Sequence, residues 1–516
     1  YSHQFYASNR HLITNAIRGY LHSNFNVLEL YTDHQRPEQR GAYRFARHWA
    51  DIADEQGMLL IYPLPKINSY LSHWDDPQVQ RQWQTQVDET YRRVSNHPSI
   101  VSWVFTANRF GFRDDQNPKR IGQSEFLSGS PVYQHRVKPA YQAVDMIHAM
   151  DPTRPVTSHS GGNVGDYQTT NCYLNMIPLQ ERENWLSDWS VHGDKPYMVV
   201  EFGLPLYTTL LRGRSNYVKA SATEPFLTEY AAIYLGPKAY GMETSGYRQE
   251  LTDRYLHDFV FKRWHANEVI EHEPAFQEIL SLFTKHTWRS WRTWGISGGM
   301  IPWSDGSSWK SRTPSDPVDM PPFAPGQLGC YQKQVPQWLY YNLLPGGRPK
   351  LPLGEALTSG NSPTLAWIAG GGDSFTNKHH HFFAGQKVEK RIVLINDTRK
   401  PQTYTYTWKS QLGDKLIASG KHAGELSVGQ ISFEPFDFHL PQVATKTSGT
   451  IELTANIGNV THTDHFIYRT YPVVNTKNHE IKYVQLLDST GKTRQALHEL
   501  GVQAIDWDGQ PHGSEI

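Results

Sequence analysis

The sequence predicts an α/β protein, namely a (β/α)8 TIM barrel followed by an all-β immunoglobulin-like sandwich and the start of a small α/β segment. Over the first 310 residues, short apolar runs alternate with amphipathic helical stretches, which is typical of parallel βαβ units. From about Val388 apolar and polar residues alternate between turn signals, which is typical of an antiparallel sandwich. From Ile481 a strand, a turn, a helix and another strand follow.

Eight barrel strands can be placed in order along the chain, and eight is the number that closes this barrel. The run 58–62, for example, is apolar and ends at Pro63, and the helical pattern before it stops at Gly57. The predicted strands are residues 2–6, 25–31, 58–62, 97–105, 155–158, 169–174, 197–200 and 298–303. The predicted helices between them include residues 11–22, 41–56, 77–95 and 137–150.

Composition changes along the chain predict four parts. The barrel comprises residues 1–310, and a Pro/Gly-rich segment that wraps around it comprises 311–386. The sandwich comprises 387–475, with alternating strands at 391–395, 402–408 and 449–454. Residues 476–516 form the incomplete α/β segment.

Composition narrows the possible partners. The 516 residues include 50 basic and 50 acidic side chains, without a basic stripe, so neither nucleic acid nor an acidic membrane surface is an expected partner. No run of 18 apolar residues predicts a membrane span. The 16 Trp and 28 Tyr suit stacking on sugars as well as core packing, so a carbohydrate substrate is the expected partner, and a homo-oligomer stays open. The start at Tyr1, without a signal-like segment, fits a processed form, and a secreted or periplasmic location is favoured over a cytoplasmic one.

One carboxylate stands where a barrel would need it. The run 197–200, bounded by Pro196 and Gly203, predicts a buried parallel strand that ends at Glu201. A buried carboxylate is costly without a partner, and the carboxyl ends of barrel strands face the active site. Glu201 is therefore the leading candidate for a catalytic group, and the alternative is a structural ion pair at the strand end.

Three motifs together resemble the clan A retaining glycoside hydrolases, above all the family 2 β-galactosidases and β-glucuronidases. His97-Pro-Ser-Ile-Val-Ser-Trp103, followed by Asn108, is similar to their fourth-strand signature. Lys195-Pro with Glu201-Phe-Gly203 resembles their strand-7 nucleophile motif, and Gly298-Gly-Met-Ile-Pro-Trp303 resembles their strand 8. The resemblance covers about residues 1–475 and implies hydrolysis of a β-glycosidic bond at a non-reducing end.

The resemblance also implies roles for single residues. Retaining hydrolysis needs two carboxyl groups about 5 to 5.5 Å apart, one to attack the anomeric carbon and one to protonate the leaving oxygen. Glu201 matches the nucleophile, and Asn108 would hydrogen-bond the sugar 2-hydroxyl. The next residue should be the acid/base Glu, but it is Arg109. Arginine stays protonated and is a poor proton donor, so the acid/base role does not carry over to position 109.

Three interpretations of this departure stay open. In the first, another carboxylic acid serves as the general acid, because this role requires only a suitable position and a raised pKa. The candidates are Asp114, Asp115, Glu125 and Glu243. In the second, Arg109 binds a carboxylate or a sulfate of the substrate, which indicates an acidic polysaccharide. The first and second interpretations are compatible. In the third, the acid is lost and the barrel binds carbohydrate as a pseudoenzyme. Asp114 and Asp115 also fit an ordinary solvated turn. A lyase-like or transglycosylating barrel is a further rival.

Four more residues are candidates for substrate contacts. His159 follows the fifth predicted strand, where hydroxyl binding and packing fit equally well. Tyr173, at the end of the sixth, would supply the aromatic partner of the nucleophile that the resemblance implies. Trp303 would stack under a sugar ring or cap the barrel core, and Asp305 would bind a hydroxyl or begin a turn.

No cofactor or metal is expected. Cys172 and Cys330 match no metal or redox spacing. The sequence contains neither a Gly-rich phosphate loop nor a Ser-His-Asp elbow. The triplet His379-His-His381 has no carboxylate or Cys pattern beside it, which favours a surface or packing role.

Overall fold

The computed structural model describes residues 10–30, 42–107, 133–172, 174, 177–202, 226–243, 274–302, 308–310, 348–473 and 484–509. The chain divides into two compact units. The first comprises residues 1–365, 395–399 and 428–431, and the second comprises 366–394, 400–427 and 432–516. Every described strand of the predicted barrel belongs to the first unit.

Two parallel sheets form the centre of the first unit, one in the order β1-β2-β3-β4 and the other in the order β5-β6-β7. The strands are β1 (Val27–Glu29), β2 (Leu59–Pro63), β3 (Ile100–Ala107), β4 (Val156–His159), β5 (Gln168–Cys172), β6 (Tyr197–Phe202) and β7 (Gly299–Pro302). Seven of the predicted strands are thus confirmed, and the predicted strand 2–6 lies outside the described residues. Parallel neighbours in sequence order are what a (β/α)8 barrel requires.

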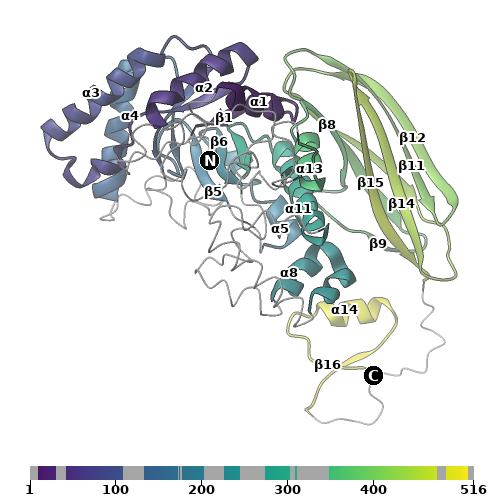
Figure 1. Ribbon diagram of the computed structural model, residues 1–516. Helices are drawn as coiled ribbons and strands as arrows, with labels where there is room; N and C mark the ends of the chain where they lie inside the picture. Colours follow the sequence, from purple (N-terminus) through teal and green to yellow (C-terminus); the bar gives the residue numbers. More distant parts are fainter. Residues whose placement is uncertain are drawn as a thin grey trace. The chain divides into compact units, whose positions relative to one another are not determined.

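Helices connect these strands and lie outside them, as Figure 1 shows for α1 to α4. The first four are α1 (Arg10–Leu21), α2 (Ala42–Gln56), α3 (Pro77–Val94) and α4 (Lys138–Met150). The later ones are α5 (Leu179–Glu183), α6 (Trp189–His192), α8 (Phe226–Leu235), α11 (Pro274–Thr293) and α13 (Pro352–Gly360), with the 3-10 helix η9 (Gly236–Glu243). The start of α3 follows from its sequence, because Asp76 accepts a hydrogen bond from the Gln78 amide at 2.8 Å and Pro77 opens the first turn.

The strands bury side chains on both faces. On the outer faces they pack against the helices, Trp103 of β3 and Val199 of β6 being examples. On the inner faces, Ile61 and Val104 of the first sheet pack with Val200 of the second in one apolar cluster. Side chains from both sheets therefore meet in a common interior, as they do in the packed core of a barrel. Closure of the barrel through residues 2–6 stays an expectation.

The four-stranded sheet is strongly curved. Glu29 ends β1 and His159 ends β4, and these strands are the two edges of the sheet. In a flat sheet the two edges would lie roughly 14 Å apart, given about 4.8 Å between neighbouring strands. The Nδ1 atom of His159 nevertheless lies 2.8 Å from Oε1 of Glu29. The carboxyl ends of the edge strands have thus been brought together by curvature.

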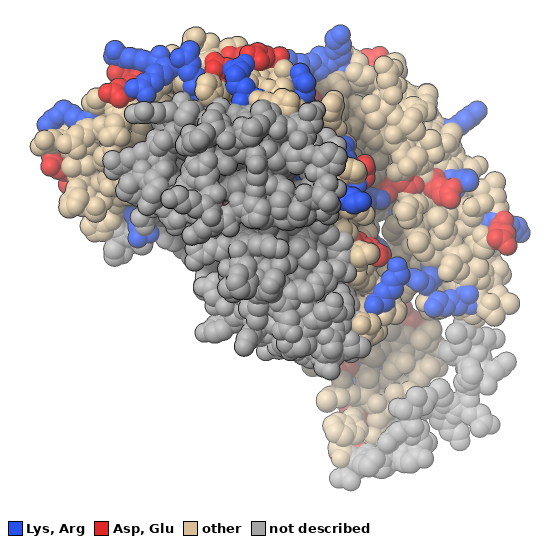
Figure 2. Space-filling model, in the orientation of Figure 1, with Lys and Arg blue, Asp and Glu red and all other residues tan. Residues whose placement is uncertain are grey.

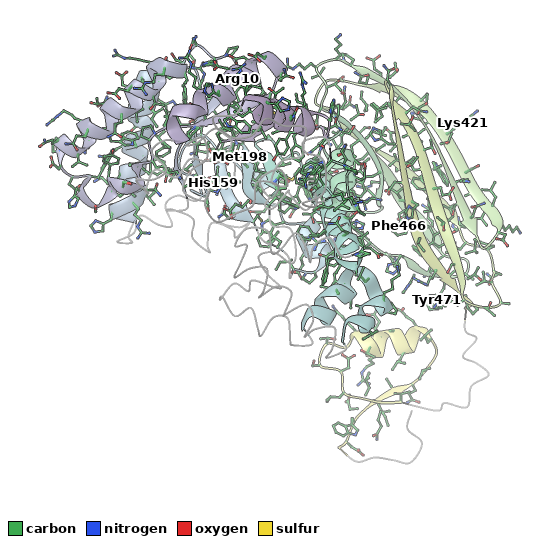
Figure 3. All side chains as sticks on the ribbon, in the orientation of Figure 1. Arg10, His159, Met198, Lys421, Phe466 and Tyr471 are labelled. Atoms are coloured by element: carbon green, nitrogen blue, oxygen red, sulfur yellow. The ribbon has the colours of Figure 1, made fainter. Side chains whose placement is uncertain are left out.

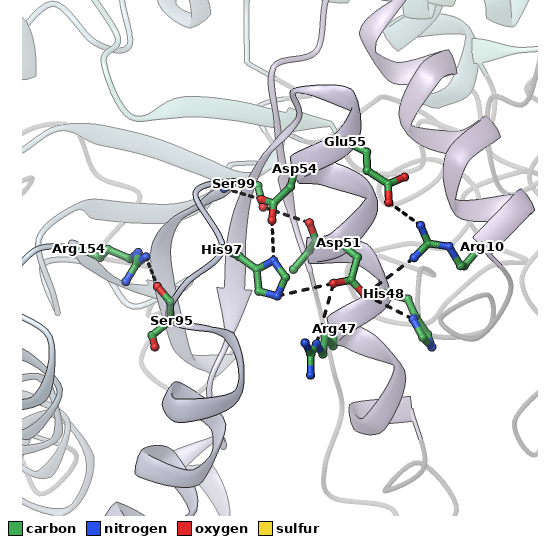
Figure 4. Close-up of polar contacts among 11 residues, drawn as sticks. Arg10, Arg47, His48, Asp51, Asp54, Glu55, Ser95, His97, Ser99 and Arg154 are labelled. Atoms are coloured by element: carbon green, nitrogen blue, oxygen red, sulfur yellow. Dashed lines mark hydrogen bonds and ion pairs between the residues drawn. The ribbon is translucent and has the colours of Figure 1, made fainter.

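The His-Pro-Ser motif lies at the amino end of β3 and connects this strand to α2 (Figure 4). His97 Nδ1 lies 2.6 Å from Oδ2 of Asp54, and Oδ1 of Asp54 accepts a 2.9 Å hydrogen bond from the Ser99 amide. Burial acts to raise the pKa of Asp54, but the hydrogen bonds from Ser99 and His97 outweigh it and hold the pKa below its usual value. The motif therefore stabilises the fold at the end of the sheet away from Glu201.

We expect Asp54→Ala to lower the free energy of unfolding by about 1–3 kcal/mol, because the buried His97 ring and the Ser99 amide lose their acceptor. Asp88→Ala is the matched control, since Asp88 pairs with Arg92 in an exposed i,i+4 ion pair at 2.9 Å, worth only about 0.3–0.5 kcal/mol. Urea unfolding of both variants measures the difference. Equal stability of the two variants would contradict the role given to Asp54.

In the second half of the chain, two sheets pack over one apolar core. Their strand orders are β13-β10-β8 and β12-β11-β14-β15-β9. The strands are β8 (Thr364–Gly370), β9 (His381–Phe383), β10 (Lys387–Asn396), β11 (Gln402–Leu412), β12 (Lys415–Leu426), β13 (Ile431–His439), β14 (Thr447–Ile457) and β15 (Val460–Tyr471). Ile392 of one sheet and Trp408 and Ile451 of the other share the core, so the two-sheet arrangement is that of a sandwich.

The structure differs from the sequence predictions for this part of the chain in two ways. The β11–β12, β11–β14 and β14–β15 pairs are antiparallel as predicted, but β9 joins β15 in parallel. The predicted wrapping segment 311–386 also contains regular structure, namely α13, β8 and β9. An immunoglobulin-like topology stays an expectation.

The predicted strand–helix–strand pattern near the end of the chain is confirmed. It consists of β16 (Val484–Leu486), α14 (Lys492–Glu499) and β17 (Ala504–Asp506), and the two strands pair in parallel. A right-handed crossover through one helix is the usual way to join parallel neighbours.

Basic and acidic side chains are interspersed on the described part of the face shown in Figure 2, in keeping with the balanced charge. Among the helices that the structure describes, none has the length and apolar character needed to cross a membrane.

Candidate active site

Glu201 lies near the carboxyl end of β6 and is buried, with 5 % of its surface exposed. Regular alternation would point its side chain the same way as that of Val199, toward the helices. Between Val199 and Phe202, however, β6 has one residue more than β7, and both of these side chains pack against the helices. This β-bulge turns Glu201 to its partner His159, and bulges often re-aim side chains next to active sites.

The loop after β4 fixes the backbone around His159. Ser160, the next residue, has φ 57°, in the left-handed region that few non-glycine residues adopt. Thr169 of β5 holds this turn, because its hydroxyl donates to the Ser158 carbonyl at 2.6 Å and accepts from the Gly161 amide at 3.0 Å. A backbone conformation of this kind persists only where its surroundings enforce it.

His159 lies inside the first unit (Figure 3), and its ring is placed between two carboxylates. Its Nδ1 atom is 2.8 Å from Oε1 of Glu29, and its Nε2 atom is 3.2 Å from Oε1 of Glu201. The ring is 1 % exposed, and Glu29 is 9 % exposed. Ionised carboxylates only accept hydrogen bonds, so the ring satisfies both of them when both nitrogens carry a proton. The geometry thus favours an imidazolium between two carboxylates.

Electrostatics support the same protonation state. Burial acts to lower the pKa of His159, but the charge of Glu29, together with the hydrogen bonds to Glu201 and Glu29, outweighs it. The result is a pKa raised to about 9. At neutral pH the ring therefore places positive charge directly against Glu201, which favours its carboxylate form.

This arrangement predicts a pH-dependent stability. A histidine in the unfolded chain has a pKa of about 6.5, so the stabilisation from His159 is complete below that pH. It is lost as the pH rises toward about 9, and the loss amounts to about 3 kcal/mol. Urea unfolding at several pH values measures it, and in His159→Gln the corresponding decrease should be missing. Parallel pH dependences in the two proteins would contradict the assignment.

The structure describes two of the predicted site residues, Glu201 and His159, and it brings them together. The other predicted site residues lie outside the described residues: Asn108, Arg109, Asp114, Asp115, Tyr173, Trp303 and Asp305. Of the two further acid candidates, Glu125 lies there as well, and Glu243 is the last residue of η9. The hydroxyl-binding role of His159 stays a prediction; both its nitrogens already face carboxylates, so a hydroxyl would have to displace one of them.

Glu29 is a site residue that the sequence interpretation missed. It ends a short apolar strand, β1, in the same way as Glu201 comes near the end of β6. The signal that singled out Glu201, a carboxylate at the end of a buried strand, was therefore also present at Glu29.

A comparison with protein families matches part of the first unit. Residues 43–230 match the family model described as glycosyl hydrolases family 2, TIM barrel domain. The matched range includes Arg109, His159 and Glu201, while Glu29 precedes it. The match covers less than half of the chain, and it shows that residues 43–230 are similar to this barrel domain. No curated protein matches the chain.

Solved structures similar to this chain include three glycosidases. A β-D-mannosidase from Dictyoglomus thermophilum has 13% identity and a TM-score of 0.45 and matches 90% of this chain. An exo-chitosanase from Amycolatopsis orientalis has 14% identity and a TM-score of 0.41 and matches 90% of this chain. A β-glucuronidase from Bacteroides uniformis has 12% identity and a TM-score of 0.35 and also matches 90% of this chain. This chain covers 48%, 47% and 44% of those proteins, about half the length of each.

Proposed function

We propose that this chain is a glycoside hydrolase that cleaves β-glycosidic bonds, with Glu201 as the nucleophile. The observation that carries the proposal is a buried carboxylate near the carboxyl end of a parallel strand, hydrogen-bonded to a buried imidazole. The match of residues 43–230 to the family 2 barrel model, a range that includes Glu201, supports the same class of reaction. An attacking carboxylate must be ionised and held in place, and the contact with His159 serves both needs.

The proposed substrate is a β-galactoside-like unit at the non-reducing end of a poly- or oligosaccharide. Arg109 extends this proposal, since its planar guanidinium suits a carboxylate or a sulfate on the sugar. An acidic or sulfated polysaccharide is therefore the favoured source of substrate. Asn108, Tyr173, Trp303 and Asp305 complete the proposed sugar-binding set.

The proposed general acid is Asp115 or Asp114, in the segment that follows Arg109. Glu29 does not suit this role, although it belongs to the same network as Glu201. The imidazole ring of His159 occupies the space between the two carboxylates. A glycosidase needs that space for the scissile bond or for the attacking water.

The test is hydrolysis of neutral, uronic and sulfated β-glycosides, each carrying either a 2,4-dinitrophenyl or a methyl leaving group. Dinitrophenolate departs without protonation, so cleavage of these substrates needs the nucleophile but not the acid. We expect one dinitrophenyl glycoside to be cleaved, and the charge of its sugar to show the role of Arg109. Cleavage of the matching methyl glycoside would show that an acid is present.

The rival function is that of a carbohydrate-binding pseudoenzyme, which the missing acid/base Glu favours. It predicts that no dinitrophenyl glycoside is cleaved and that wild type and Glu201→Gln bind oligosaccharides equally well. That pair of results would overturn the proposed function.

A further inference from the structure

Two buried carboxylates contact His159. The proposed role as nucleophile accounts for Glu201 but not for Glu29. A structural ion pair needs one carboxylate for one imidazolium, and burying a second carboxylate against the same ring adds a desolvation cost. Glu29 nevertheless makes the shorter of the two contacts, 2.8 Å against 3.2 Å for Glu201. The presence of Glu29 would be explained if, at some stage, Glu201 no longer balances the positive charge of the His159 ring.

The reaction itself contains such a state. When Glu201 attacks, a bond forms between its oxygen and the anomeric carbon, and the bond from that carbon to the leaving oxygen breaks with its electron pair. The leaving oxygen departs as an alkoxide or phenolate, protonated by the general acid where the leaving group needs it. Glu201 is then a neutral ester. Among the residues that the structure describes, Glu29 is then the carboxylate that still balances the charge of the imidazolium.

We propose that Glu29 and His159 form a positioning pair for Glu201, in which His159 orients the nucleophile and Glu29 keeps the ring charged throughout the catalytic cycle. The proposal rests on the proposed function of Glu201. It assigns Glu29 no contact with substrate, because the ring lies between it and the nucleophile. The His159 ring is contacted from both sides, by Glu29 of β1 and by Glu201 of β6.

The charge on the ring decides whether it can hold both carboxylates. A neutral imidazole carries one N–H, so one carboxylate would then face the lone pair of a ring nitrogen. In the described part of the chain, Glu29 from β1 and Glu201 from β6 are charged groups that face the ring, and both act to raise its pKa. Removal of the Glu29 charge should therefore make the ring lose its proton at lower pH, after which Glu201 loses its fixed orientation.

The experiment is the pH profile of kcat/KM for wild type and Glu29→Gln, measured with the dinitrophenyl glycoside that the wild type cleaves. We expect the alkaline limb to move to lower pH by about 1–3 units, the usual effect of one neighbouring charge. With the wild-type limb at the His159 pKa of about 9, this corresponds at pH 8 to a loss of about 2-fold for a shift of 1 unit and about 10-fold or more for a shift of 2 units or more, whereas at pH 5.5 the two proteins should agree within about 3-fold. Superimposable profiles would overturn the proposal.

Glu183→Gln is the matched control. Glu183 is also a fully buried carboxylate of the first unit; it accepts a 2.7 Å hydrogen bond from Ser290 and lies 3.7 Å from Nδ1 of His286. It lies on α5, in the packing against α11. We expect this variant to lose stability and to keep the wild-type alkaline limb. An equal shift in both variants would mean that the effect is general destabilisation, and the proposal would fail.

Direct titration of His159 tests the pair without any enzymatic activity. In protein labelled at histidine Cε1, the signal of His159 is assigned by its loss in His159→Gln and followed against pH. We expect a pKa well above 6.5 in wild type and a lower one in Glu29→Gln. A ring that is neutral at pH 7 in the wild type would overturn the proposal even if Glu201 proves to be the nucleophile. If no glycoside is cleaved but His159 titrates as expected, the proposed function fails and the charged pair stands as a structural feature only.

Discussion

Glu201→Gln should lower kcat for the best glycoside by on the order of 10⁴-fold or more, the scale seen when a covalent nucleophile is removed. The amide has the shape of the carboxylate and still offers an oxygen to the Nε2–H of His159, which lies 3.2 Å from Oε1 in the native protein. It lacks the charge and the nucleophilicity needed to attack the anomeric carbon. We therefore expect a folded protein with little activity.

Two measurements make this result specific to Glu201. Thermal unfolding of Glu201→Gln should show a cooperative transition, so that the loss of activity is not a loss of fold. Glu183→Gln, a second buried Glu→Gln change in the same unit, should retain wild-type kcat within a few-fold. If Glu201→Gln keeps more than a tenth of the wild-type kcat, Glu201 is not the nucleophile.

We also expect a large effect on the stability of the first unit when Trp103 is replaced. Trp103 of β3 is fully buried, donates a 2.9 Å hydrogen bond from its indole nitrogen to Asp151, and packs edge-to-face against Tyr62 and Tyr91. The guanidinium of Arg154 lies over its ring, 5.4 Å from the centroid. Trp103→Ala should lower the free energy of unfolding by about 4 kcal/mol, since it opens a large cavity and leaves a buried carboxylate with one donor fewer.

The control for this prediction is Trp507→Ala, because Trp507 is 50 % exposed. Its removal should change the stability by no more than about 0.5 kcal/mol. Denaturant unfolding followed by far-UV circular dichroism measures both variants without relying on tryptophan fluorescence. A loss of less than 1 kcal/mol for Trp103→Ala would show that the packing around β3 is not decisive for the first unit.

Much of the fold could be predicted because the strands of parallel sheets are continuous apolar runs. The run 58–62 is one example, and the structure places β2 at residues 59–63. The 20-residue helix α11 was not predicted, and α13 and β8 lie in a segment that its Pro and Gly content marked as a linker. In that segment tertiary packing outweighs local composition, as in the burial of Leu353 and Leu357 of α13 against α11.

The candidate site could be predicted only in part. A carboxylate at a buried strand end is visible in the sequence, and it singled out Glu201. The pairing of Glu29 with His159 depends on the curvature of a sheet, which brings together residues 130 positions apart. The orientation of Glu201 depends on a one-residue bulge in β6, which no periodic pattern of apolar residues shows. The roles of Arg109 and of the general acid stay predictions from the sequence.

Covalent trapping is the decisive test of Glu201 as the nucleophile. A 2-deoxy-2-fluoro dinitrophenyl glycoside, with the sugar that the wild type cleaves, slows the hydrolysis of a glycosyl-enzyme so that the intermediate accumulates. The mass of the intact protein should rise by one fluorosugar, and peptide mapping should place the label on Glu201. A label on another carboxylate, or turnover of the normal substrate with no label at all, would contradict the assignment of Glu201 as the nucleophile.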